Sequence, residues 1–435
     1  MNALAQVLAA RGIMVCGSDR GFDRGDNVQL MYKLRRLGVE LRPQDGSGVG
    51  SDIDRIIVSR AVEKDNPDLK KGKKLKIPVC YRQDEWKRIF REHPGIAVAG
   101  TSGKTTVVGM LACIFEAAGV DIKIVNGGIM KNYVIGGNIG NVVWGGVDYY
   151  CMETDESEGD LKGYGPHIGV LTNIGRDHMS GGRLADIYRE FIGEIKDVLV
   201  INNDIEIDTG KKAKITFSVS GPEADISVRI TELRPEYSIF SVDGFLFRLY
   251  VPGRHNIENA AAAIGVAYAW GVPVSAVREG LRRFRGIARR FEVLSEVNGI
   301  KVVDDFAHNP DKVKAAFQAA GLEKGRVMAV YQPHGYGPTK MFMKEMARVF
   351  AANLGQDDFL FVPEIYYAGG TVDKDVSSAD LVAAIKKING MLNVYTAPRR
   401  DNILRALACL LTYGDTVLVM GARDVTLHQW AEHIL

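Results

Sequence analysis

The sequence predicts an α/β fold of mostly parallel sheets, divided into three domains. Short apolar runs alternate with amphipathic helical stretches along the whole chain, a pattern typical of βα units. That alternation restarts at GIAVAG and again at GIKVVDD. With 435 residues, the chain is also too long for one ordinary hydrophobic core. We therefore expect domains at residues 1–93, 94–296 and 297–435.

Residues 1–93 are predicted to form a Rossmann-like domain, in which strands such as 54–60 alternate with helices such as 29–38. The chain opens with helical spacing over residues 1–11, and a strand with a Gly-Ser-Asp turn follows at 13–19. Because no strand precedes that helix, we expect the sheet of this domain to lack its first strand.

The second domain opens with a strand, a glycine-rich loop and a helix. Glycines let the loop point its N–H groups inward, Lys104 can reach phosphate oxygens, and Thr105 can hold Mg²⁺ at the positive end of the helix. The pattern is a variant of the phosphate loop, because it is shorter than GxxxxGK[ST] when counted from Gly100. It predicts ATP binding; the alternative is a glycine-rich turn with an incidental lysine. The loop residues are Gly100, Thr101, Ser102, Gly103, Lys104, Thr105 and Thr106.

Carboxylates and an imidazole follow two further strands of this domain. Glu153, Asp155 and Glu156 follow one strand, and Asp177 and His178 follow the next. Because Mg²⁺ prefers oxygen ligands, a hard-cation site is predicted there. The alternative, a solvated acidic loop, applies most to Asp155, Glu156 and Glu158.

Two later segments of the second domain have distinct patterns. Residues 212–250 contain short strands with little helix between them, so we expect a small antiparallel patch. Asn256 and Asn259 then lie at i and i+3 of an alanine-rich helix, where two amides on one face suit a nucleotide. The alternative for Asn256 is helix capping.

The third domain begins with charged residues at a strand end. Arg289 and Arg290 precede its first strand, and Asp304, Asp305 and His308 end it. Ligands bind at the carboxyl ends of strands in open parallel sheets, so an arginine that clamps phosphate and a carboxylate that binds ribose are predicted. The alternative is a salt bridge between domains.

Composition excludes several classes of protein. The net charge is +2, with 55 basic and 53 acidic residues, which gives no sign of a nucleic-acid binder. No long apolar run or signal-peptide pattern is present, so we expect a cytoplasmic protein without a membrane partner. The five cysteines are scattered and lack a CxxC pair, which favours reduced thiols. Small-molecule substrates are the expected partners, with a monomer or homodimer as the assembly.

Taken in order, these motifs resemble those of the Mur ligase family of ATP-dependent amide-forming enzymes. The matching segments are GTSGKTT, ETDES, TNIGRDHM, PGRHNIENA, RRFE and DDFAHNP. QPHGYGPTK, VSSADL and VLVMGARD further resemble the branch that adds L-alanine to UDP-N-acetylmuramate in peptidoglycan precursor synthesis. The family has a Rossmann-like UDP-substrate domain, a central ATPase domain and a Rossmann-like C-terminal domain for the amino acid.

The resemblance implies a reaction with two steps and a set of site residues. A substrate carboxylate attacks the γ-phosphate of ATP, and an amino group then displaces phosphate from the acyl phosphate. The implied residues are Lys104, His178, Arg290 and His308 for catalysis; Thr105, Glu153 and His178 for Mg²⁺; the phosphate loop, Asn256, Asn259 and Asp305 for ATP; and Asp19, Ser59, Asn138, His308 and His334 for the acid and amino-acid substrates.

The chain departs from the family pattern in its QPH segment and at its start. Gly335 and Pro338 stand where two arginines are expected, Lys340 is the nearby cation, and Arg423 replaces a glycine. A single lysine binds a carboxylate less well than two guanidinium groups do. The alternatives are therefore a ligase for another acid and amine, or a nucleotide-binding paralogue without ligation.

Met1 falls where the methionine of a family GxGGxGM turn would be, after a strand that this sequence lacks. In the family, that turn approaches the UDP pyrophosphate. Either the sequence starts late, or the element is lost and nucleotide-sugar binding is weak.

Overall fold

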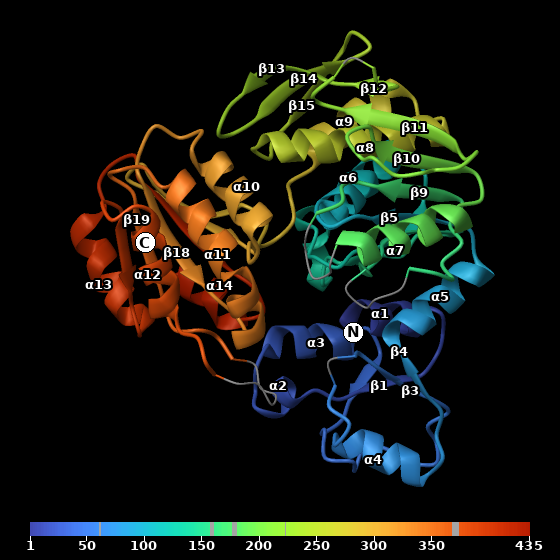
Figure 1. Cartoon of the computed structure of the whole chain (residues 1–435). Helices are drawn as coiled ribbons and strands as arrows, with labels where there is room; N and C mark the ends of the chain where they lie inside the picture. The colour runs from blue at the N-terminus through green and yellow to red at the C-terminus, as the bar shows by residue number, and fades with distance from the viewer. Residues whose placement is uncertain (61, 157–160, 176–180, 222, 368–373) are drawn as a thin grey trace. The chain divides into compact units, whose positions relative to one another are not determined.

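The computed structural model describes residues 1–60, 62–156, 161–175, 181–221, 223–367 and 374–435 (Figure 1). Two compact units divide the chain, and each is described by itself. Unit 1 comprises Met1–Arg229, Ser241–Phe247 and Glu258–Arg285, and unit 2 comprises Ile230–Phe240, Arg248–Ile257 and Gly286–Leu435.

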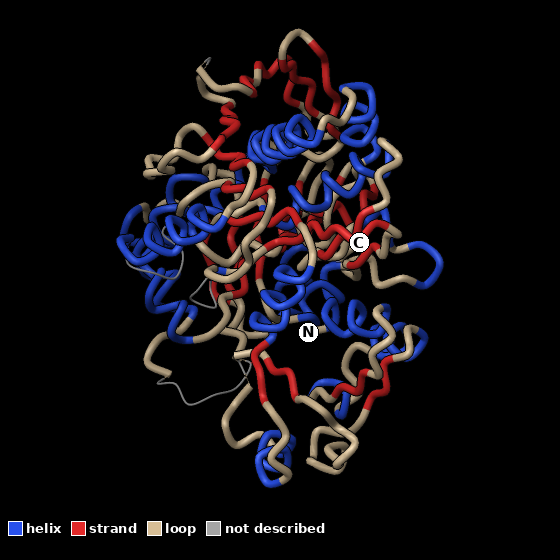
Figure 2. The backbone as a smooth tube through the Cα atoms, turned by 90° about the vertical axis from the view of Figure 1, so that its right-hand side faces the viewer, coloured by secondary structure: helices blue, strands red, loops and turns tan. Residues whose placement is uncertain are grey.

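The strands at the start of unit 1 form two separate parallel pairs. β1 (Val15–Gly17) pairs with β2 (Val39–Leu41), and β3 (Ile56–Val58) pairs with β4 (Val79–Tyr81). Figure 2 shows the two pairs apart, and no described strand joins them. Parallel pairing agrees with the expected Rossmann-like class, whereas the division into two pairs was not predicted. The helices of this region are α1 (Asn2–Ala10), α2 (Arg20–Asp23), α3 (Val28–Arg36), α4 (Pro67–Lys74) and α5 (Arg82–Glu92).

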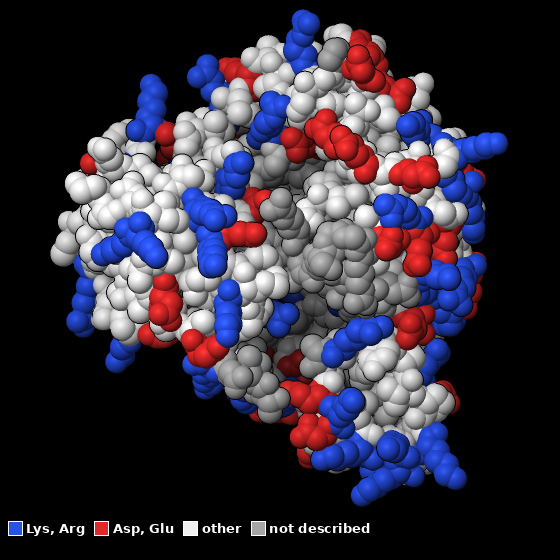
Figure 3. All heavy atoms as spheres, viewed as in Figure 1, with Lys and Arg blue, Asp and Glu red and all other residues white. Residues whose placement is uncertain are grey.

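Positive charge gathers on α4. Its four lysines, Lys70, Lys71, Lys73 and Lys74, are all exposed, and Figure 3 shows Lys and Arg side chains crowded over this helix. The Asn66 side chain caps the helix start, and three of the lysines occupy the last turn, where the helix dipole favours cations.

The main sheet of unit 1 has eight strands in the order β12-β11-β10-β9-β5-β8-β6-β7. All of its neighbours are parallel except β6 and β7. The strands are β5 (Gly95–Ala99), β6 (Ile122–Val125), β7 (Val142–Val143), β8 (Val147–Glu153), β9 (Ile168–Leu171), β10 (Val198–Asn202), β11 (Ala213–Ser218) and β12 (Ile226–Ser227).

The expected antiparallel patch at residues 212–250 is smaller than predicted. β11 and β12 extend the main parallel sheet, so this part of the prediction is wrong. A separate three-stranded sheet contains only β13 (Arg229–Leu233), β14 (Ser238–Val242) and β15 (Phe245–Leu249). Asp243 and Gly244 both have positive φ and connect β14 to β15 as a two-residue hairpin turn.

Helices cover both faces of the main sheet. Leu199 and Ile201 of β10 belong to a buried cluster with residues of α1, α5 and α7 (Gly181–Glu194). Val200, between them, faces the opposite side, where a Cβ on Gly265 of α8 (Arg254–Trp270) would lie 2.7 Å from its Cγ1. α6 (Lys104–Ala117) and α9 (Val274–Arg283) pack closely on each other, since a Cβ on Gly280 would meet the Ile114 backbone. No helix within the described ranges is long and apolar enough to cross a bilayer.

Unit 2 contains a six-stranded sheet in the order β16-β17-β21-β18-β19-β20. β16 is antiparallel to β17, and the other neighbours are parallel. Its elements are β16 (Glu292–Val297), β17 (Ile300–Asp305), α10 (Pro310–Ala320), β18 (Val327–Gln332), α11 (Tyr336–Asn353), β19 (Phe359–Val362), α12 (Ser378–Ile388), β20 (Asn393–Thr396), α13 (Arg400–Leu410), β21 (Thr416–Gly421) and α14 (Val425–Ala431). The short 3₁₀ helices η1 (Lys131–Tyr133) and η2 (Ile135–Gly137) belong to unit 1.

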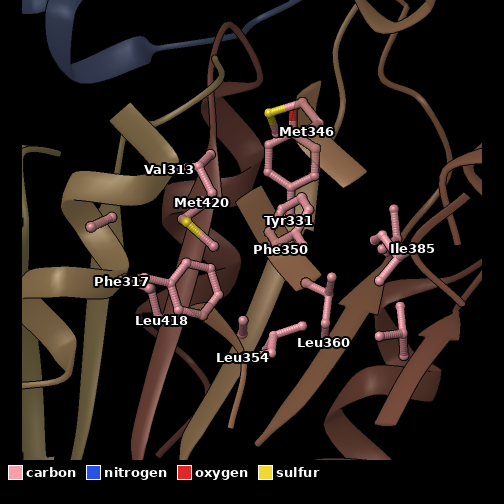
Figure 4. Packing of buried hydrophobic residues seen from close by; sticks show 14 of the residues in the cluster. Val313, Phe317, Tyr331, Met346, Phe350, Leu354, Leu360, Ile385, Leu418 and Met420 are labelled. Carbon is pink, nitrogen blue, oxygen red and sulfur yellow. The ribbon is translucent and has the colours of Figure 1, made fainter. Parts of the chain in front are cut away.

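Each face of this sheet has its own core. Leu418 and Met420 of β21 pack with Phe317 and Phe350 on the face covered by α10, α11 and α12 (Figure 4). The alternate residues of the same strand pack with α13 and α14 on the other face. Near-continuous apolar strands are typical of a parallel sheet that is buried on both sides.

Candidate active site

The phosphate-type loop connects β5 to α6, and only glycine fits at two of its positions. Gly100 and Gly103 have φ of 127° and 87°. A Cβ on Gly100 would lie 2.1 Å from Thr172 Oγ1, and a Cβ on Gly103 would lie 2.1 Å from Asn259 Oδ1. The backbone therefore turns tightly before α6, as predicted, and Asn259 lies against the loop.

The end of β9 holds the loop in place. Asn173 accepts a hydrogen bond from the Ser102 N–H (2.8 Å) and donates one to the Ser102 carbonyl (3.0 Å). The Thr172 hydroxyl also donates to that carbonyl (2.6 Å), and the Gly175 N–H donates to the Thr101 hydroxyl (2.8 Å). Thr172 and Asn173 were not predicted as site residues, although their position at a strand end beside the loop was a usable signal.

Lys104, the loop lysine, is bound by an acidic residue. Its ammonium lies 2.8 and 2.9 Å from the two carboxylate oxygens of Glu156, and it also donates to the Gly100 carbonyl. The side chains of Lys104 and Glu156 are only 15% and 12% exposed. Glu156 is thus not a solvated loop residue, whereas Asp155 is half exposed and lies 3.4 Å from Arg82. A phosphate that binds Lys104 must take the place of the Glu156 carboxylate.

Thr105 and Glu153 come together at the first turn of α6. The Thr105 hydroxyl donates to Glu153 Oε2 (2.6 Å), and the carboxylate lies against Gly127, where a Cβ would clash with it. Asn126 donates to the Thr105 carbonyl (2.9 Å) and is another residue the sequence analysis missed. One hydroxyl and one carboxylate at a helix N-terminus suit Mg²⁺, which keeps several of its waters. His178, the other predicted metal ligand, and Asp177 lie outside the described residues.

Asn256 and Asn259 share one face of α8 and are both 7% exposed. Asn256 donates to the Pro252 carbonyl (2.6 Å), and it is the third residue of α8, so this bond is not the helix cap that the alternative expected. Asn259 is the residue of the pair that lies against Gly103.

The three predicted contacts to a nucleotide sugar all lie in unit 1. Asp19 follows β1 and caps α2 through the Gly21 N–H (2.7 Å), and Ser59 follows β3. Asn138 is exposed, and its carbonyl accepts from Lys33 of α3 (2.9 Å). Asp19 and Ser59 each follow a strand of a parallel pair, at the edge where parallel sheets bind ligands.

In unit 2, Asp305 is tied to backbone. Its carboxylate accepts from the N–H groups of Phe291 (2.6 Å) and Ala307 (2.7 Å). Burial raises the pKa of Asp305 to about 6, against the opposing charge of Arg290 and these two hydrogen bonds. Arg290 itself lies over the Phe306 ring, 5.3 Å from its centroid.

Arg289 is part of a buried ion pair. Its Nε lies 3.0 Å from Asp304 Oδ2, and its Nη2 donates to the Gly421 carbonyl (2.9 Å). His428 Nδ1 lies 2.6 Å from the same Asp304 oxygen. The salt-bridge alternative therefore describes Arg289, within unit 2, and His428 is a partner that the sequence did not reveal.

His308 and His334 form a pair at the carboxyl edge of the unit 2 sheet. Their ring centroids are 5.3 Å apart, and His308 Nδ1 lies 2.8 Å from the Phe306 carbonyl. Burial, with the nearby Lys312 charge, lowers the pKa of His308 to about 2, so this ring is neutral. The two rings line a pocket whose other walls are mostly apolar: Tyr331, Phe342, Met343, Met346 and Leu381.

The QPH segment beside that pocket carries no arginine. Gly335 has φ 69° and ψ 134°, a conformation that glycine adopts readily, and it is the N-cap residue directly before α11. Lys340 forms an ion pair with Asp375. Gly335, which stands where the family has an arginine, thus adopts a backbone conformation that suits glycine.

Comparison with known proteins agrees with this arrangement. Residues 98–267 match the Mur ligase middle domain, and residues 289–423 match the Mur ligase glutamate ligase domain. A UDP-N-acetylmuramate–L-alanine ligase from Pelotomaculum thermopropionicum is 34% identical, over 98% of this chain and 93% of the relative. One with the same name from Carboxydothermus hydrogenoformans is 35% identical, over 98% and 92%. The chain belongs to the Mur ligase family.

Solved Mur ligase structures share this fold. The UDP-N-acetylmuramate–alanine ligase of Thermotoga maritima has a TM-score of 0.81 at 22% identity and covers 100% of this chain and 95% of its own. A murein peptide ligase from Psychrobacter arcticus has a TM-score of 0.70 at 20% identity, with coverages of 100% and 97%. As a Mur ligase, the protein is an ATP-dependent enzyme that joins an acid to an amine.

Proposed function

We propose that this Mur ligase adds L-alanine to UDP-N-acetylmuramate, in the cytoplasm, as a step of peptidoglycan precursor synthesis. The observation that carries the proposal is the loop at residues 100–106, with Lys104 bound by a carboxylate and the Thr105 hydroxyl 2.6 Å from Glu153. This arrangement suits a triphosphate with Mg²⁺. The full-length relatives named for alanine ligation support the choice of substrates.

Each predicted residue then has a proposed role. Lys104 and Arg290 bind the transferred phosphoryl group as the substrate carboxylate attacks it, since two anions must be held together by fixed positive charge. Bound Mg²⁺ would be held by Thr105 and Glu153, with His178 at a second metal, and would supply positive charge to the phosphates. Asn256, Asn259 and Asp305 are proposed for the nucleotide; Asp19, Ser59 and Asn138 for the UDP-sugar; and His308 and His334 for the amino acid.

We also propose that residues 1–93, 94–296 and 297–435 are the three domains, and that the enzyme is a monomer or homodimer that uses only small-molecule substrates. The family plan of three domains supports the boundaries.

One observation favours a second acceptor. Gly335 and Pro338 leave the QPH segment without a guanidinium, so another amino acid is the second candidate.

The test is phosphate release from ATP with UDP-N-acetylmuramate and each of the twenty amino acids. Release that needs both the sugar acid and L-alanine, and that disappears in Lys104→Ala, is expected. Release with a different amino acid supports the second candidate. No release with any pair, from protein that binds ATP, contradicts the ligase proposal.

A further inference from the structure

Arg423 occupies a strained turn at the carboxyl end of β21. Its φ is 66°, and the Asp424 N–H donates to the Ala422 carbonyl (2.8 Å) across it, which makes a three-residue γ-turn of the rarer, strained form. Positive φ is intrinsically unfavourable for an arginine, because its Cβ crowds the backbone in that conformation.

Both sides of this turn are fixed. On one side, Gly421 pairs with Gln332 in the sheet, and its carbonyl accepts from Arg289. On the other side, Asp424 caps α14 through the Thr426 N–H (2.9 Å), and its buried carboxylate is bound by Arg400. Strained residues held from both sides in this way cluster at functional sites.

The Arg423 guanidinium is available to bind a ligand. Arg423 is exposed and forms no ion pair or side-chain hydrogen bond with any residue that the structure describes. The neighbouring cations differ: Arg289 is bound to Asp304, Arg400 to Asp424 and Gln332, and Lys340 to Asp375.

Sheet order places the loop that carries Arg423 between the two loops that carry the histidines. β21 lies between β17 and β18, so the loop after β21 emerges between the loop that carries His308 and the loop that carries His334. The pocket that these histidines line is mostly apolar. His308 is neutral, so an anionic ligand of this pocket depends on the surrounding cations, which are Lys312 and Arg290 as well as Arg423.

We infer that Arg423 binds the carboxylate of the acceptor amino acid and so selects amino acids over simple amines. The inference rests on the proposed ligase function. A planar guanidinium can hold a carboxylate through two parallel hydrogen bonds, and the substrate amine is then left free to react.

The test compares L-alanine with L-alaninamide, which lacks the carboxylate, in the phosphate-release assay on the full-length enzyme. In Arg423→Gln we expect the KM for L-alanine to rise about 10- to 100-fold, the usual effect of losing a charged hydrogen-bonded contact. The KM values for ATP, UDP-N-acetylmuramate and L-alaninamide should stay as in the wild type. Arg423→Lys should restore part of the affinity for L-alanine.

Two further variants separate binding from folding. Arg423→Gly removes the backbone strain, so it should melt no lower than the wild type and still lose L-alanine affinity. Arg399→Gln is the matched control: Arg399 is an exposed arginine that follows β20, three strands away in the sheet, and its loss should leave all KM values unchanged.

The outcomes distinguish the two proposals. An unchanged KM for L-alanine in Arg423→Gln, or equal use of L-alanine and L-alaninamide by the wild type, overturns the role of Arg423 and leaves the ligase function standing. A wild type that releases phosphate with no amino acid overturns both.

Discussion

Lys104 is held by Glu156 through two close contacts in a site that is mostly shielded from solvent. An ion pair of this kind is screened little by salt, so it competes with an incoming phosphate for the same ammonium. Nucleotide binding at this loop is therefore an exchange of one anion for another.

This exchange predicts the effect of Glu156→Gln. The amide keeps the size of the side chain but removes its charge, so ATP should bind several-fold more tightly in the variant, as measured by isothermal titration calorimetry. Glu116→Gln, at the opposite end of α6, is the control and should bind ATP like the wild type. Weaker ATP binding in Glu156→Gln would mean that this carboxylate contacts the nucleotide or its metal instead.

At the scale of single residues, the sequence predicted the site residues that are contiguous in the chain. Residues 100–106 were recognisable because the loop chemistry lies within seven consecutive positions. The pairing of Lys104 with Glu156, and the support of Ser102 by Asn173, were not predicted because they join positions 52 and 71 residues apart. Such contacts depend on strand order, which local patterns do not specify.

Among the elements, the start of α6 depends on Gly103. Gly103→Ala would place a Cβ 2.1 Å from Asn259 Oδ1 in a left-handed conformation. We expect it to lower the free energy of unfolding by at least ~1–2 kcal/mol and to weaken ATP binding. Urea unfolding and calorimetry would measure the two effects.

The control for this glycine is Gly193→Ala in α7, where a Cβ would meet nothing within 4 Å. That variant should be as stable as the wild type or gain roughly 0.5–1 kcal/mol, because alanine is the better helix former. Equal effects at both glycines would contradict the argument from packing.

The anchoring of α14 predicts a pH dependence. Hydrogen bonding to Asp304 raises the pKa of His428, against the effect of its burial. Because the folded pKa is raised, the stabilisation is complete below the unfolded value near 6.5 and is lost as pH rises through the higher folded pKa. Unfolding by urea across pH 5.5 to 8.5 should show this loss as a difference between the wild type and His428→Gln that shrinks as pH rises.

His428→Gln should remove that dependence, whereas His433→Gln, at an exposed position two residues beyond α14, should retain it. A difference in the free energy of unfolding between the wild type and His428→Gln that stays constant across this range would show that Asp304 does not hold a protonated His428.

Element types were more predictable than their sheet membership. Short strands were expected within residues 212–250, yet β11 joins the parallel sheet beside β10 rather than the antiparallel patch. Apolar spacing gives the exposed and buried faces of a strand but not the identity of its neighbour.

For the whole molecule, the alternation of strands and helices was sufficient to predict the α/β class, and each unit has the expected parallel sheet. The division into two units differs from the three proposed domains, because unit 1 includes residues on both sides of the boundary at 93/94. Composition did not predict this division. A net charge of +2 also gave no hint of the four exposed lysines on α4.

The stability of unit 2 should depend strongly on Phe350. This ring is fully buried on α11, with its centroid 5.2 Å from that of Tyr331 and 5.9 Å from that of Phe317 (Figure 4). Phe350→Ala should lower the free energy of unfolding by about 3–5 kcal/mol. Phe245→Ala, at a half-exposed position on β15, should cost far less, and similar losses in denaturant titrations would contradict this ranking.

The order of strands in unit 2 has a consequence for how the protein is made. β21 is the last of the six strands to be synthesised, yet it lies inside the sheet between β17 and β18. While the ribosome is still translating, β17 and β18 have no neighbour to separate them correctly, so the sheet cannot close until residues 416–421 have left the exit tunnel. A nascent chain therefore exposes two apolar strand edges until β21 has emerged, and products that terminate before residue 416 should be recognised by chaperones and proteases.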